Sequence, residues 1–174
     1  MDYNPKKRYP LIIATYGFKG KRDALNAEEW HTYFPAKVLA KEGYFVLLLN
    51  TPNGDNSQTM TNASEQAREK CGWQKLKVFE QAVIMLVSKE LVNENKIGLY
   101  GWSHGAFMVE FFISHSNKFH VACVGEGGDF NPGGFWIGGH RPWTKIYDNI
   151  FGGPPWGKTL KNYLDFSPFF NLKT

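Results

Sequence analysis

The chain has 174 residues, 43% hydrophobic and 21% charged, a composition that argues against extended disorder and allows one domain with its own core. The formal net charge is +4, but only residues 6–8 and 19–22 cluster lysine and arginine, so we expect no nucleic-acid partner. No apolar stretch approaches the roughly 20 residues that cross a bilayer, and the polar start is no signal peptide. We therefore expect a soluble protein, cytoplasmic or periplasmic, without a membrane partner.

Two apolar runs in the first third of the chain predict strands. Residues 9–16 and 44–49 are continuous and rich in aliphatic side chains, as expected for strands buried on both faces. Between them, apolar residues recur at helical spacing over about 27–41, and Gly43 ends that helix. The order is therefore strand, helix, strand.

The same alternation continues along the chain. Residues 73–91 predict a strongly amphipathic helix, 96–100 a strand, 106–113 a helix and 119–124 a further strand. Alternating strands and helices predict an α/β fold, with a mainly parallel sheet, right-handed crossovers and helices on both faces. Seven glycines among residues 125–140 then predict an irregular loop, without a phosphate-binding pattern.

The most informative motif lies between a predicted strand and a predicted helix. Residues 101–105 read Gly-Trp-Ser-His-Gly, and Gly-x-Ser-x-Gly in this position is the nucleophile elbow of the α/β-hydrolase fold. The turn is so sharp that side chains at the flanking positions would collide, so glycines there leave the hydroxyl of Ser103 exposed above the sheet. Chance alone produces the pentapeptide in roughly one such sequence in fifteen, so the strand and helix around it carry the interpretation.

The elbow and four further landmarks resemble the catalytic domain of the prolyl oligopeptidase family of serine peptidases, in the order of that family. The landmarks are YPLII at 9–13, GYFVL at 43–47, KIGLYGWSHG at 96–105, IYDNI at 146–150 and DFSP at 165–168. Residues 9–52 are also similar, more weakly, to the branch that includes lasso-peptide isopeptidases. The resemblance implies hydrolysis of peptide or isopeptide bonds through an acyl-enzyme on Ser103, with a peptide substrate and no cofactor.

The resemblance also implies an oxyanion hole. In the family a tyrosine just after the first of these strands donates its hydroxyl, and Tyr16 occupies that place. The second donor is the backbone amide of His104, the residue after the nucleophile. Residues 16–19 lack the family's usual paired glycine, and Ala106 stands where a further glycine is common. The sequence therefore does not determine the width of the oxyanion pocket.

In this fold the acid and the histidine of the triad follow the serine. Only 71 residues follow Ser103. We therefore expect residues 1–174 to be a partial hydrolase domain, incomplete at both ends, without the family's β-propeller and inactive alone. His140 is the single positional candidate for a base within the chain, whereas His31, His115 and His120 are interpreted as surface or structural histidines.

The remaining candidates have ordinary structural interpretations beside functional ones. Glu126 and Asp129 follow a strand end, where they could bind a substrate amine or be surface charges. We interpret Asp129 as a structural or loop residue rather than as a triad acid. Asp148 and Asp165 are expected to cap helices. The three late tryptophans line a pocket or pack in the core: Trp136, Trp143 and Trp156.

No side-chain cluster has the spacing of a zinc or calcium site, so no metal is expected. Cys71 and Cys123 are far apart and are expected to be buried free thiols, with a disulfide left open. Two other functions stay open: an esterase or thioesterase that uses the same elbow, and a non-catalytic binding module that keeps the scaffold without its triad.

Overall fold

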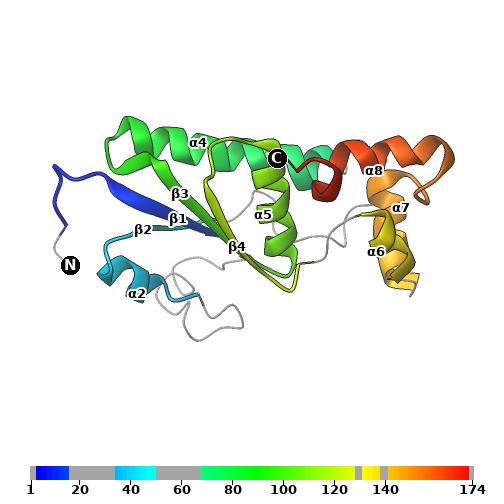
Figure 1. Ribbon diagram of the computed structural model, residues 1–174, viewed down its shortest axis with the longest axis horizontal. Coiled ribbons are helices and arrows are strands. Elements are labelled where there is room, and N and C mark those ends of the chain that lie inside the picture. Colours follow the sequence, from blue (N-terminus) through cyan, green and yellow to red (C-terminus); the bar gives the residue numbers. More distant parts are fainter. Residues whose placement is uncertain (1–2, 16–33, 50–67, 128–130, 138–140, 173–174) are drawn as a thin grey trace.

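The computed structural model of the protein describes residues 3–15, 34–49, 68–127, 131–137 and 141–172. Within them, four strands form one sheet in the order β2-β1-β3-β4, and all neighbours are parallel. The strands are β1 (Tyr9–Thr15), β2 (Phe45–Leu48), β3 (Val92–Trp102) and β4 (Val121–Gly125). The parallel sheet expected from the sequence is therefore confirmed (Figure 1).

The central strands β1 and β3 end side by side at the predicted site. Their register pairs Ile13 with Leu99 and Thr15 with Gly101, so the carboxyl end of β1 lies beside the residues that precede Ser103. Ile13 and Leu99 are almost fully buried, which explains why both strands read as apolar runs. β3 begins at Val92, four residues before the predicted strand.

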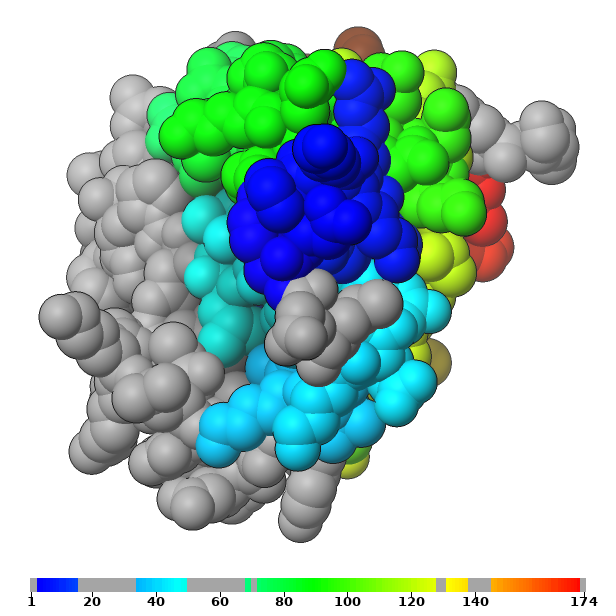
Figure 2. All heavy atoms as spheres, turned by 90° about the vertical axis from the view of Figure 1, so that its left-hand side faces the viewer, coloured from blue at the N-terminus to red at the C-terminus, as the bar shows by residue number. Residues whose placement is uncertain are grey.

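Three helices cover the sheet. They are α2 (Ala36–Lys41), α4 (Gln74–Ser88) and α5 (His104–His115). The chain steps from β1 to β2 in one direction and from β2 to β3 and β4 in the other, so right-handed crossovers place α2 on one face and α4 and α5 on the opposite face. α2 and α4 lie on either side of β1 in Figure 2.

The predicted helix over residues 27–41 is wrong at its described N-terminal part. Phe34 and Pro35 are not helical, and α2 begins only at Ala36. The side chain of Phe34 is instead buried against the ring of Tyr100, with 4.8 Å between ring centroids. The apolar side chain of Phe34 thus belongs to a non-helical residue that enters the core.

Residues 125–140 are not wholly irregular, which corrects the sequence-based prediction. They contain the short helix α6 (Pro132–Ile137), because Asn131 caps it by accepting a hydrogen bond from the amide of Gly134 at 2.7 Å, and because Pro132 fits a first helical turn. The C-terminal elements that follow are α7 (Arg141–Phe151), η3 (Gly157–Thr159), α8 (Leu160–Phe166) and η4 (Pro168–Phe170).

The expected helix caps at Asp148 and Asp165 are also wrong. Asp148 lies inside α7, and Asp165 lies in the last turn of α8, where its exposed carboxylate forms an ion pair with Lys161 one turn earlier. The DFSP motif ends α8 instead: Ser167 is its extended C-terminal neighbour, and Pro168 cannot continue the α-helix.

Helix α5 is buried nearly all round because it lies between the sheet and the C-terminal helices. Phe107, Phe111 and Phe112 are at most 1% exposed. The ring of Phe166 in α8 packs against the ring of Phe111, with 4.8 Å between centroids, and against that of Phe151 in α7, with 5.9 Å between centroids. The C-terminal helices therefore extend the aromatic core that fixes α5.

No helix in the described ranges combines the length and the apolar character that a bilayer crossing requires. Cys123 is a free thiol, as expected, but it is exposed on β4 rather than buried. The side chain of Cys71 lies outside the described residues.

Candidate active site

The nucleophile elbow lies at the carboxyl end of β3. Ser103 stands between β3 and α5, and its side chain is exposed. Its backbone has φ of +52° and ψ of −121°, a conformation that L-residues other than glycine rarely adopt and that costs of order 1–3 kcal/mol. Its amide donates to the carbonyl of Gly125 at 2.9 Å, so the end of β4 holds this strained turn in place.

The two glycines of the motif are required by close backbone contacts. A Cβ atom on Gly101 would lie 2.2 Å from the carbonyl oxygen of Gly105, and a Cβ atom on Gly105 would lie 2.2 Å from that of Thr15. Both distances are far below van der Waals contact, and backbone atoms cannot rotate away. The sequence-based reason for these glycines is thus supported by the packing of β1, β3 and α5.

The first turn of α5 points its amides back at the elbow. The amides of Ala106 and Phe107 donate to the carbonyl of Ser103 at 2.9 and 3.3 Å. The amide of His104 is the first of the helix, where the helix dipole favours a negative charge. A negative oxygen that develops beside Ser103 would face this end of the helix.

Tyr16, the predicted side-chain donor of the oxyanion hole, lies outside the described residues, as do His31, Asp129 and His140. Its chain neighbour Thr15 ends β1 opposite Gly101. The sequence position of Tyr16 is therefore next to the strand end that borders the elbow.

The described histidines away from the elbow have other roles. Nδ1 of His115 lies 2.9 Å from the carbonyl oxygen of Phe111, and its ring stacks on that phenylalanine with 4.1 Å between centroids. His120 is exposed just before β4, at the opposite end of the sheet from Ser103. Neither is placed to accept a proton from Ser103.

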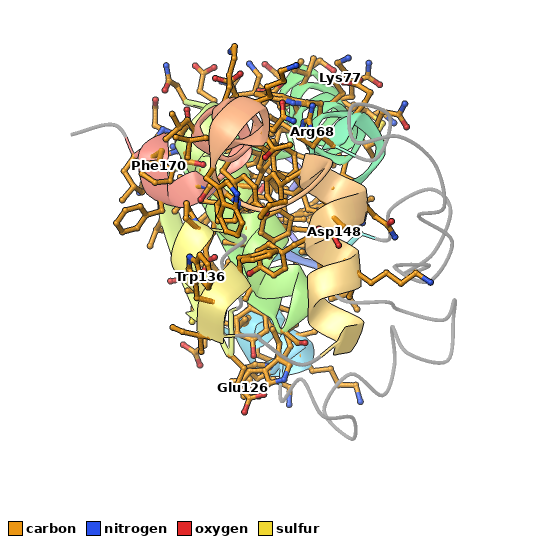
Figure 3. The ribbon with its side chains drawn as sticks, turned by 90° about the vertical axis from the view of Figure 1, so that its right-hand side faces the viewer. Arg68, Lys77, Glu126, Trp136, Asp148 and Phe170 are labelled. Atoms are coloured by element: carbon orange, nitrogen blue, oxygen red, sulfur yellow. The ribbon has the colours of Figure 1, made fainter. Side chains whose placement is uncertain are left out.

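Glu126 and two tryptophans lie beyond the carboxyl ends of the strands. Glu126 is exposed directly after β4, and it lies with Trp136 on the face shown in Figure 3. Trp136 and Trp156 stack with 5.1 Å between ring centroids and are 64% and 50% exposed, so they are not core residues. The side chain of Trp143 is outside the described residues.

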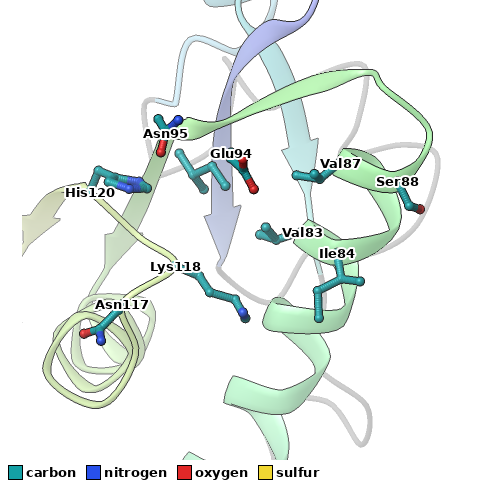
Figure 4. A pocket seen from close by; sticks show the side chains of 10 residues that line it. Val83, Ile84, Val87, Ser88, Glu94, Asn95, Asn117, Lys118 and His120 are labelled. Atoms are coloured by element: carbon teal, nitrogen blue, oxygen red, sulfur yellow. The ribbon is translucent and has the colours of Figure 1, made fainter.

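A cavity of about 420 Å³ lies at the other end of the sheet (Figure 4). Its lining includes Ile84, Val87, Glu94, Lys118 and His120. Ile97, which also lines the cavity, is six positions before Ser103 in the regular part of β3, which corresponds to about 20 Å at 3.3 Å per residue. The cavity is therefore separate from the elbow.

Sequence reasoning missed Lys75, a buried cation beside the elbow. Its Nζ lies 3.2 Å from Nε2 of His104, and the residue is only 7% exposed. The available signal was its position four residues before Phe79, on the apolar face of α4. Among the described residues, no three metal-binding side chains gather into a cluster.

The parallel sheet, the exposed serine in a strained strand-to-helix turn and the adjacent helix N-terminus together are typical of the α/β-hydrolase fold. Residues 30–174 match the prolyl oligopeptidase family. The chain therefore belongs to this family.

A dipeptidyl peptidase and an isopeptidase are among the relatives of the chain. The chain is 26% identical over 157 residues to dipeptidyl-peptidase 5 of Porphyromonas gingivalis, covering 90% of this chain and 22% of that protein. It is 28% identical over 129 residues to the lasso peptide isopeptidase AtxE2 of Asticcacaulis excentricus, covering 71% and 18%. The chain thus spans about a fifth of the length of these relatives.

Solved structures show the same fold. The AtxE2 isopeptidase without ligand superposes with a TM-score of 0.69 at 23% identity, over 97% of this chain and 26% of that one. Dipeptidyl peptidase 4 of Porphyromonas gingivalis gives 0.62 at 16% identity, over 97% and 22%. At these identities the likeness establishes the fold alone.

Proposed function

We propose that this chain carries the nucleophile and the oxyanion hole of a serine peptidase that cleaves peptide or isopeptide bonds. The observation that carries the proposal is the backbone of Ser103, held at φ +52° with its side chain exposed at the carboxyl end of β3. A strained, exposed serine in a turn closed by two obligatory glycines has no evident packing role, whereas nucleophilic attack requires this exposure.

In the proposed reaction the hydroxyl oxygen of Ser103 attacks the scissile carbonyl carbon. The amide of His104 and the phenol of Tyr16 donate to the carbonyl oxygen as it becomes negative, and the hydroxyl proton passes to a histidine base and then to the leaving amine. Water then releases the acyl group from the serine. Neither His115 nor His120 is placed to be that base.

The substrate class follows from the relatives rather than from a pocket in the described residues. Dipeptidyl peptidases and a lasso peptide isopeptidase share the family, so a peptide or isopeptide bond is the proposed target. Glu126 is exposed beside the elbow, where its carboxylate would attract the amine of a peptide N-terminus. No cofactor is part of the proposed reaction.

A fluorophosphonate probe tests the proposal, because it forms an adduct only with an activated serine. We expect the protein to be labelled, and Ser103→Ala to abolish the adduct without unfolding the protein.

Substrates distinguish the two remaining functions. Turnover of acyl esters but not of peptides would assign an esterase or thioesterase. A gene product that neither labels nor hydrolyses either class would be a non-catalytic binding module, and the proposed function would be wrong.

A further inference from the structure

A buried lysine lies beside the residue that follows the nucleophile. Lys75 is the second residue of α4, and its Nζ lies 3.2 Å from Nε2 of His104 and 3.8 Å from Sδ of Met108. His104 and Met108 are four residues apart, so they present one face of α5 to the lysine. An ammonium that is only 7% exposed loses most of its hydration, which is unfavourable unless its contacts compensate.

The N-terminal end of α4 is held in a fixed position against α5. A wide helical turn, η2 (Glu69–Trp73), precedes α4, with the amide of Gln74 donating to the carbonyl of Glu69. Such wide turns are frequent at functional sites. A Cβ atom on Gly72 would lie 2.8 Å from Cζ of Phe111, so the chain touches α5 here, one turn before Lys75.

We propose that Lys75 is a positioning residue for the serine site: it donates a hydrogen bond to Nε2 of His104 and thereby fixes the first residue of α5 beside Ser103. The inference rests on the proposed function, in which the amide of His104 holds the oxyanion. The proposal gives a residue of α4, which lies outside the Gly-x-Ser-x-Gly motif, a role in the site.

The chemistry of the contact fixes the state of the imidazole. A lysine ammonium has three donors and no acceptor, so Nε2 of His104 must accept and the ring proton must reside on Nδ1. The ring and the helix start are then held by a bond from another helix. The ammonium also adds positive charge near a helix N-terminus, where the oxyanion forms.

Histidine ring NMR tests the contact independently of catalysis. With ¹⁵N-labelled histidine, and with the His104 signals assigned by their loss in His104→Gln, we expect a neutral ring protonated on Nδ1 at pH 8. Lys75→Met has a similar length but no donor, so the ring should change towards a mixture of tautomers. Lys77→Met is the matched control, because Lys77 is exposed on the outer side of α4 (Figure 3).

Fluorophosphonate labelling of the same variants tests the consequence. Removal of one oxyanion donor costs about 10²- to 10³-fold, so loss of a residue that only positions the donor should slow labelling about tenfold in Lys75→Met. The control should label at the rate of the unmodified protein. The melting temperature of Lys75→Met should change little, because relief of the desolvated ammonium offsets the loss of the hydrogen bond to His104.

Five results would contradict these claims or separate them. A His104 ring that is protonated on Nε2, or that does not change in Lys75→Met, refutes the hydrogen bond. Unchanged labelling of Lys75→Met refutes the positioning role, and so does slower labelling that a loss of folded protein accounts for. No labelling of the unmodified protein, with the ring in the expected state, refutes the proposed function but leaves the contact established.

Discussion

Replacement of Gly105 by alanine sets helix propensity against packing. Gly105 lies in the first turn of α5, and in an exposed helix alanine would stabilise by about 1 kcal/mol relative to glycine. The added Cβ atom, however, would lie 2.2 Å from the carbonyl oxygen of Thr15, more than 1 Å short of the 3.4 Å at which ordinary contact begins. The two effects predict opposite signs for the change in stability.

We expect packing to dominate. Overpacking of a tight core costs typically 1–3 kcal/mol, and this contact belongs at the upper end because Thr15 is fixed in the sheet by its pairing with Gly101. After the propensity gain, Gly105→Ala should lower the free energy of unfolding by about 2 kcal/mol. Relief of the clash would move the start of α5 by about 1 Å, a displacement that can cost about 100-fold in reactivity.

Urea denaturation and fluorophosphonate labelling measure both effects. Gly133→Ala is the control: it also lies in the first turn of a helix, but its Cβ atom would meet only the side-chain oxygen of Asn131, at 3.0 Å. We expect the control to change stability by no more than about 1 kcal/mol. Equal or greater stability of Gly105→Ala, with an unchanged denaturant slope, would refute the close packing of the elbow on β1.

Three further predictions concern strain, ionisation and the aromatic core. Ser103→Gly should abolish labelling yet raise stability by about 1 kcal/mol, because glycine adopts positive φ without strain; a loss of stability would contradict a strained turn. Burial raises the pKa of Tyr163 well above its usual 10, and the charge of Asp148 adds to the effect. The neutral phenol therefore contributes stability below pH 10 that is lost as the pH rises further, so melting temperatures at pH 8 and 11 should differ less in Tyr163→Phe than in the unmodified protein. Phe166→Ala should cost about 3–5 kcal/mol of unfolding free energy, whereas Phe169→Ala, at a 59% exposed site, should cost far less; equal costs would place Phe166 outside the core.

The sequence predicted the sheet well because its strands carry their own signals. β1 and β3 are buried on both faces by the helices that cross over them, so they read as continuous apolar runs. α6 was missed because its glycines suppress helix propensity, whereas its formation depends on the Asn131 cap and Pro132. The segment before α2 was wrongly predicted to be helical because Phe34 is an apolar residue that enters the core without being helical.

Part of the candidate site follows from local sequence, and part depends on tertiary packing. The elbow was predictable because the features that form it are local: a strand, a sharp turn and a helix follow one another within a few residues. The close contacts of the turn require glycine at Gly101 and Gly105. The lysine contact was not, because it joins residues 29 positions apart on two helices whose relative placement only the packed core decides. A motif search therefore finds the proposed nucleophile but not the lysine that we propose orients its neighbour. The paired variants Lys75→Met and Lys77→Met test that second, tertiary contribution in one experiment.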